Sequence, residues 1–265
     1  MYPRGVTESP RRAPPAKRLG AKAPAASAPG RGIVAYFRTR HDPLTSLVLT
    51  IPVFLLYHLG ILALDLRNGV DLVSGITLEL LHESLAAYVA LTLAVAAGLL
   101  ATTFAMRKRG VLKPATLAPV LVESVVWAVV MLFAVGWATT HLFAAQVGQA
   151  RALGPFEKLV MSAGAGFHEE LVFRVGLFGG AVWLLRRFVP SLKSTFAVLL
   201  AALVTSLVFS AIHYVGPLGD SFRLVSFVSR LLAGLYLCAL YRTRGFAVAV
   251  YTHALYDIMI FFFLQ

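Results

Sequence analysis

Residues 159–185 read LVMSAGAGFHEELVFRVGLFGGAVWLL, a stretch that is apolar enough to cross a bilayer yet carries charged residues near its middle. A bilayer core of about 30 Å needs roughly 20 predominantly apolar residues in a helix. A charge at the centre of such a helix costs about 2.5–3.5 kcal/mol on insertion scales and tends to be kept for a functional reason. The stretch therefore predicts a membrane helix that contributes to a functional site.

Apolar stretches of similar length recur through the rest of the chain. They lie near residues 44–64, 85–106, 117–144, 196–214, 224–240 and 246–264. Only helices satisfy their own backbone groups in lipid at these lengths. We therefore predict an all-α fold, a polytopic transmembrane helix bundle of about seven spans. Residues 71–83 are predicted to form a loop or a short interfacial helix.

Composition excludes an ordinary soluble protein. The 265 residues are 58% hydrophobic and 14% charged, with a mean hydropathy of +0.78, whereas soluble domains average about 45–50% apolar and about 25% charged residues. The net charge of +12 lies in the N-terminal tail and in short loops beside apolar runs, which is typical of topology signals. We expect an integral membrane protein in contact with the lipid bilayer and with no nucleic-acid partner.

The chain divides by composition into a tail and a membrane domain. Residues 1–40 are rich in Pro, Ala, Gly, Arg and Lys, which predicts a disordered basic tail. Residues 41–265 are predicted to form one transmembrane domain. Basic clusters after the second, fourth and sixth spans share a side with this tail, so the positive-inside rule places the N-terminus in the cytoplasm.

The charged residues of the stretch 159–185 have different neighbours along the predicted helix. Glu170 and Arg174 are four residues apart and meet on one face, where they form either a structural ion pair or part of a catalytic site. Glu169 is turned about 100° away and stays unpaired along the helix. Glu169 is therefore predicted to be the available carboxylate.

Two later spans carry further polar groups. His213 follows Phe209 by one helical turn, and His253 and Asp257 stand four residues apart on one face. If the helices pack together, Glu169 and His213 can hold a water, and the carboxylate can take its proton as the water attacks a carbonyl. His253, oriented by Asp257, is the candidate donor to the resulting oxyanion.

These motifs together resemble the CPBP intramembrane proteases, which include the CAAX prenyl endopeptidases and bacterial Abi-type relatives. The family patterns Glu-Glu-x-x-x-Arg, Phe-x-x-x-His and His-x-x-x-Asn/Asp are met, in order, by Glu169, Glu170 and Arg174, by Phe209 and His213, and by His253 and Asp257. The resemblance covers residues 117–265. It implies a bundle of about eight helices around a cavity in the membrane, with the first Glu and the middle His activating water and the last motif holding the oxyanion.

The chain departs from the family pattern at two positions. Val175 separates Arg174 from Gly176, where the family commonly has Gly directly after Arg, and the last motif ends in Asp257 in place of Asn. An ionised Asp cannot donate to an oxyanion. The resemblance therefore casts Asp257 as the group that orients His253, or as a carboxyl kept protonated by burial.

Two alternatives remain open beside a metal-free peptidase. Glu169, His213 and His253 are a plausible three-ligand zinc set, although no His-Glu-x-x-His signature is present. We expect no cofactor and no metal, with zinc as the minority alternative. The expected substrate is a membrane-anchored protein, cleaved by CAAX-type or C-terminal sorting-tail processing. The rival function is a non-enzymatic scaffold, or a transporter that uses the buried charges, although no inverted repeat supports transport.

Overall fold

The computed structural model describes residues 36, 42–64, 84–108, 117–142, 154–216 and 219–263. The chain divides into two units, Met1–Arg38 and Thr39–Gln265, and the second of these contains the predicted membrane domain. All of its described regular elements are helices, as the sequence predicts. Apart from Tyr36, the predicted tail of residues 1–40 lies outside the described residues, and so does the predicted interfacial stretch 71–83.

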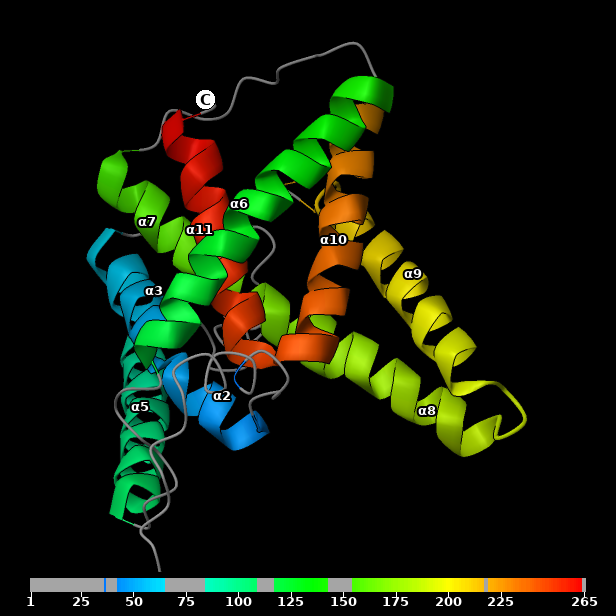
Figure 1. Ribbon diagram of the computed structural model, residues 1–265. Helices are drawn as coiled ribbons and strands as arrows, with labels where there is room; N and C mark the ends of the chain where they lie inside the picture. Colours follow the sequence, from blue (N-terminus) through cyan, green and yellow to red (C-terminus); the bar gives the residue numbers. More distant parts are fainter. Residues whose placement is uncertain are drawn as a thin grey trace, which may run out of the picture. The chain divides into compact units, whose positions relative to one another are not determined.

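Five described helices are long and apolar enough to cross a membrane (Figure 1). They are α5 (Leu85–Lys108), α6 (Leu117–Leu142), α9 (Ser194–Ile212), α10 (Leu224–Arg244) and α11 (Phe246–Phe263). The bent pair α2 (Pro43–Leu49) and α3 (Ile51–Leu64) makes a sixth if it is counted as one span. The predicted bundle of about seven spans is thus close to the described architecture, and the first and fourth predicted spans are the two that depart from a single continuous α-helix.

The first predicted span is bent by 44° between α2 and α3. Asp42 and Pro43 begin α2, with the Thr45 amide donating to Asp42 Oδ1 at 2.9 Å. At Thr50 the backbone amide and the hydroxyl both donate to the Leu47 carbonyl. Pro52 follows and has no amide hydrogen to continue the helical ladder. The bend therefore follows from local sequence.

The predicted span 159–185 is helical throughout but divided into three elements. These are α7 (Pro155–Gly164), the π-helix η2 (Ala165–Gly179) and α8 (Gly180–Phe188), with 10, 15 and 9 residues. Each is shorter than the roughly 20 residues of a bilayer span. A π-helix pairs each amide with the carbonyl five residues earlier and is frequent at functional sites. The charged motif lies within η2.

Helix α11 holds the functional elements together, since it packs against α6, α7, α10 and η2. Its first half is buried from Phe246 to Ala254. Gly245, with φ of 101°, turns the chain from α10 into α11. At Gly166 an added Cβ would lie 2.7 Å from the Val250 carbonyl oxygen, so η2 and α11 approach closely. This approach brings the first and last motifs together.

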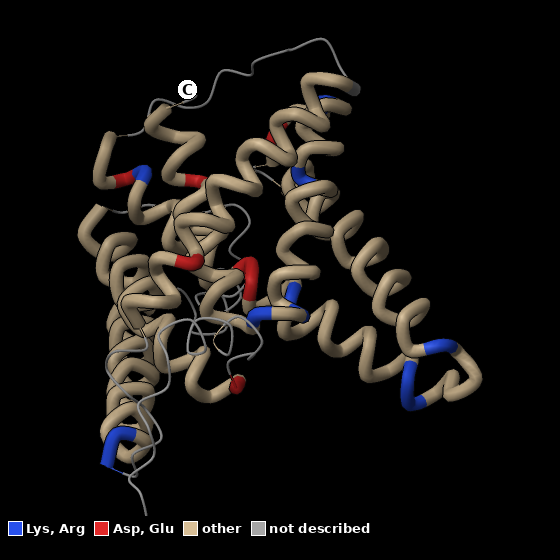
Figure 2. The backbone as a smooth tube through the Cα atoms, in the orientation of Figure 1, with Lys and Arg blue, Asp and Glu red and all other residues tan. Residues whose placement is uncertain are grey.

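Basic residues lie mainly at helix ends, for example at the end of α5 and in the turn between α8 and α9 (Figure 2). Arg244 is an exception to the predicted loop cluster, because it is buried and ion-paired with Glu123 of α6. The Trp127 indole donates to the same carboxylate at 3.0 Å. Arg244 therefore ties α10 to α6 and is not a simple topology signal.

Candidate active site

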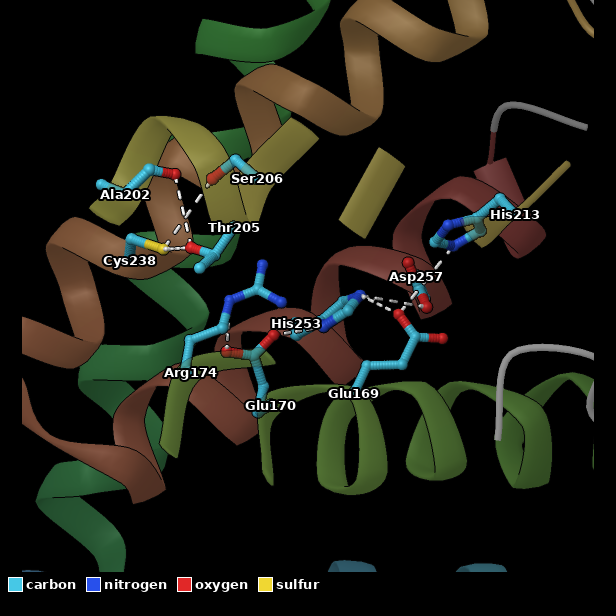
Figure 3. Close-up of polar contacts among 10 residues, drawn as sticks. All are labelled: Glu169, Glu170, Arg174, Ala202, Thr205, Ser206, His213, Cys238, His253 and Asp257. Atoms are coloured by element: carbon cyan, nitrogen blue, oxygen red, sulfur yellow. Dashed lines mark hydrogen bonds and ion pairs between the residues drawn. The ribbon is translucent and has the colours of Figure 1, made fainter. Parts of the chain in front are cut away.

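Glu169, His213 and His253 converge on one point, as the peptidase interpretation requires (Figure 3). Glu169 Oε2 lies 4.0 Å from Nε2 of His213 and 3.9 Å from Nε2 of His253. The three side chains come from η2, from the residue that ends α9, and from α11. They are far apart in the chain, so helix packing alone brings them together.

Glu170, the second carboxylate of the motif, contacts different residues from Glu169. Glu170 Oε2 lies 3.1 Å from Arg174 Nε, and both side chains are almost completely buried. The Arg174 guanidinium stacks 4.3 Å from the centre of the Phe209 ring, an arrangement that stabilises a buried cation. The predicted pairing of Glu170 with Arg174 is thus present, and Phe209 supports it from α9.

His253 forms its hydrogen bond with Glu170, whereas the sequence pattern predicted Asp257 as the group that orients it. His253 Nδ1 lies 2.8 Å from Glu170 Oε1, whereas its Nε2 lies 3.8 Å from Asp257 Oδ2. The second separation is too long for a hydrogen bond. Spacing along one helix identified Asp257, but the close approach of η2 to α11 brings a nearer carboxylate from another helix.

His213 is fixed by the backbone of its own helix. Its Nδ1 lies 2.8 Å from the Phe209 carbonyl oxygen, which can only accept, so Nδ1 carries the hydrogen. In the neutral ring, Nε2 is then an acceptor, and this atom faces Glu169. The Phe209 ring packs edge-on against His213 with 5.1 Å between ring centres. Phe209 therefore positions His213 with both its backbone and its side chain.

Exposure increases across the site from one end to the other. The Glu170 side chain is 0% exposed and that of Glu169 is 5% exposed, whereas His213 reaches 13% and Asp257 reaches 22%. The Glu170 end is closed by Arg174 and Phe209. The site is therefore more open on the side of His213 and Asp257 than on the side of Glu170.

The separations around Glu169 suit an intervening water molecule. Distances of 3.9 and 4.0 Å exceed a direct hydrogen bond, and polar groups at such separations are commonly bridged by water. A carboxylate and two imidazoles around one point can accept a proton, orient a nucleophile and donate to developing charge. The arrangement has the parts that carbonyl hydrolysis requires.

The predicted zinc alternative has a geometric requirement. Within the described part of the chain, no group of three His, Cys, Asp or Glu side chains is arranged to hold a metal ion. Two ligands of one tetrahedral zinc lie roughly 3.3 Å apart, whereas the two nitrogens lie 4.0 and 3.9 Å from Glu169 Oε2. Zinc binding by this set would draw the side chains closer.

One charged residue near the site was not predicted from the sequence. Arg230 lies within α10, which carries no other charged residue until its last turn, and it pairs with Asp220 of the preceding loop. Its position inside a predicted span was the signal that could have identified it, because intramembrane charges are functional candidates by default.

Comparison with protein families supports the resemblance based on the three motifs. Residues 151–259 match the family described as Type II CAAX prenyl endopeptidase Rce1-like. This range is shorter than the predicted 117–265, and it contains every motif residue from Glu169 to Asp257. Comparisons with curated proteins and with solved structures gave no match.

Proposed function

We propose that this membrane protein hydrolyses a peptide bond of a membrane-anchored protein with a water activated by Glu169 and His213, since residues 151–259 match the Rce1-like family of type II CAAX prenyl endopeptidases. The convergence of Glu169, His213 and His253 carries the proposal. The family supports protease activity on protein substrates. We propose the mechanism and the substrate class in addition to this protease activity.

The first step is attack by water on the scissile carbonyl. The water lies between Glu169 and Nε2 of His213, which accepts one of its hydrogen bonds. The Glu169 carboxylate takes a proton as the water oxygen bonds to the carbonyl carbon, and the carbonyl π electrons move to oxygen. When the tetrahedral intermediate collapses, the carbon–nitrogen bond breaks and the Glu169 carboxyl returns the proton to the leaving amine.

His253 is the proposed donor to the oxyanion. To donate from Nδ1 to Glu170 and from Nε2 to the oxyanion, its ring must carry protons on both nitrogens. Carboxylates of Glu170, Asp257 and Glu169 lie within 4.0 Å of the ring nitrogens and supply the countercharge. Asp257 then acts through charge, which is consistent with its 3.8 Å separation and does not require it to donate a hydrogen bond.

The substrate is proposed to be a protein whose C-terminal region is held at the membrane by a lipid or a hydrophobic segment. The family supports a CAAX-type lipidated terminus, and a C-terminal sorting tail is the second form of the same proposal. A bacterial cytoplasmic membrane is the proposed location, with processing on its outer side according to the predicted topology.

A comparison of C-terminal peptides from whole membranes tests the proposal. Cells would express the wild type, Glu169→Gln or Glu157→Gln at equal levels. Glu157 caps α7 through the Gly154 amide at 2.6 Å, and Gln can preserve that cap. We expect a set of new C-termini that is lost in Glu169→Gln and kept in Glu157→Gln. Identical termini in all three membranes would refute the peptidase and favour the scaffold or the transporter.

A further inference from the structure

Arg230 lies on the face of α10 that packs against α9, near the more exposed end of the site. At Gly234 an added Cβ would lie 2.9 Å from a side chain of α9, and toward the start of α10 the Ser210 hydroxyl donates to the Phe227 carbonyl at 2.7 Å. Arg230 stands between Phe227 and Gly234, at helical spacing. Its guanidinium carbon lies 5.3 Å from the centre of the Tyr214 ring. The guanidinium therefore reaches the end of α9.

The neighbours of Arg230 connect it with the proposed catalytic residues. Its Nη2 forms an ion pair with Asp220, whose backbone amide donates to the His213 carbonyl at 2.8 Å. The Tyr214 ring that its guanidinium contacts belongs to the residue directly after His213 in the chain. Arg230 thus borders the site on the side where exposure increases, and its own side chain is 26% exposed.

One nitrogen of the guanidinium is left for a further ligand. Nη1 of Arg230 is buried, and it has no hydrogen-bond partner among the described residues. A buried donor without a partner carries a desolvation penalty, and this penalty is larger for a charged group. Asp220 is 58% exposed and engages only Nη2. A planar guanidinium can bind a second carboxylate through its remaining donors.

We infer that Arg230 is the residue of this chain that binds a carboxylate of the leaving fragment beside the scissile bond, and that it thereby selects substrates that carry one there. This inference rests on the proposed function and adds to it a residue that determines specificity. The leaving fragment would be held by its carboxylate at Arg230 while its amide bond lies at Glu169. An acidic side chain of the leaving fragment could supply the carboxylate in place of the C-terminus. Peptides with different C-termini distinguish these two sources of the carboxylate.

The test uses the full chain in phospholipid vesicles and three peptides that differ only at their C-terminus. Each begins with a farnesylated cysteine. In two of them three aliphatic residues follow, and the chain ends in a free acid or in an amide; in the third, two aliphatic residues and a Glu follow, and the chain ends in an amide. Initial rates give kcat/KM for the wild type, Arg230→Gln, Arg230→Lys and Arg242→Gln. Arg242 is an exposed arginine at the other end of α10 and serves as the matched control.

We expect the wild type and Arg242→Gln to cleave the free acid about 10-fold to 150-fold faster than the amide, the range of one hydrogen bond to a charged group. Arg230→Gln should remove this preference by slowing cleavage of the acid alone, and Arg230→Lys should keep part of it. If the Glu-terminated amide is also cleaved faster in an Arg230-dependent manner, the site binds a carboxylate from either source. If the wild type prefers only that peptide, the free C-terminus is the wrong source.

A purely structural role for Arg230 predicts a different pattern. If Arg230 only anchors the loop through Asp220, then Asp220→Asn should reproduce Arg230→Gln, and both should slow the acid and the amide equally. That pattern, or equal rates for acid and amide in the wild type, would refute the carboxylate site while leaving the peptidase intact. Absence of any cleavage that depends on Glu169 would refute the proposed function itself, and the carboxylate site with it.

Discussion

Replacing Glu170 by Gln tests which carboxylate orients His253. Glu170 Oε1 lies 2.8 Å from His253 Nδ1, whereas Asp257 Oδ2 lies 3.8 Å from Nε2. A hydrogen bond to a charged group contributes about 1.5–3 kcal/mol, which corresponds to roughly 10-fold to 150-fold in kcat/KM if His253 acts only when held in this position. Asp257→Asn removes charge but no hydrogen bond at that distance, so its loss should be about tenfold or less.

The assay must separate catalysis from stability, because Glu170 also pairs with Arg174. Breaking a buried ion pair by removing one partner costs about 3–5 kcal/mol of folding free energy, and Gln keeps the size of the side chain and one acceptor. We would measure kcat/KM on protein shown to be folded by size-exclusion chromatography, and thermal unfolding in parallel. Glu170→Gln should lower both quantities, and Asp257→Asn should lower mainly kcat/KM. A larger loss of kcat/KM in Asp257→Asn than in Glu170→Gln would refute the assignment.

Three further predictions concern packing, stability and metal. Gly166→Ala should lower activity because the added Cβ would lie 2.7 Å from the Val250 carbonyl oxygen. Gly98→Ala serves as the control, because an added Cβ at Gly98 meets open space, and it should leave activity unchanged. Equal activities of the two variants would contradict the tight approach of η2 to α11. Arg244→Met should lower the unfolding temperature by leaving the Glu123 carboxylate buried without its guanidinium, at a cost of about 3–5 kcal/mol, and Glu123→Met in the same chain should restore part of it. Dialysis against a chelator should leave cleavage unchanged under the glutamate mechanism, whereas a loss that zinc restores would establish the zinc alternative.

The spans, and the polar side chains that converge in the structure, could be predicted from sequence for a simple physical reason. Apolar length identifies helices that must satisfy their backbone in lipid, and α5, α6, α9, α10 and α11 follow the predicted ranges within a few residues, apart from the last turn of α10. Charges inside apolar stretches are expensive, so Glu169, His213 and His253 stood out. Arg230 satisfied the same criterion and was missed, because it belongs to none of the three family motifs.

The partners of these residues were not predictable, because spacing along a helix reports only neighbours within that helix. His253 and Asp257 have the right spacing, yet His253 bonds to Glu170 of a different helix. That choice depends on the approach of η2 to α11 at Gly166. The division of the predicted span 159–185 by the π-helix η2 could not be predicted either. Apolar residues face lipid and protein alike, so the sequence carries little helical periodicity from which a change of helix type could be recognised.

The two adjacent glutamates show how packing assigns different roles to the same chemistry. Glu170 is enclosed with Arg174 and His253, so its charge is compensated: Oε1 lies at hydrogen-bond distance from His253, and Oε2 faces the Arg174 guanidinium at 3.1 Å. Glu169, one residue earlier, faces Nε2 atoms at 3.9 and 4.0 Å and keeps its oxygens available for a water. Two carboxylates in different surroundings commonly divide into one that reacts and one that supports. The same reasoning makes Glu169 the base in the proposed mechanism and Glu170 the group that holds His253, so exchanging their roles would require repacking η2 against α11.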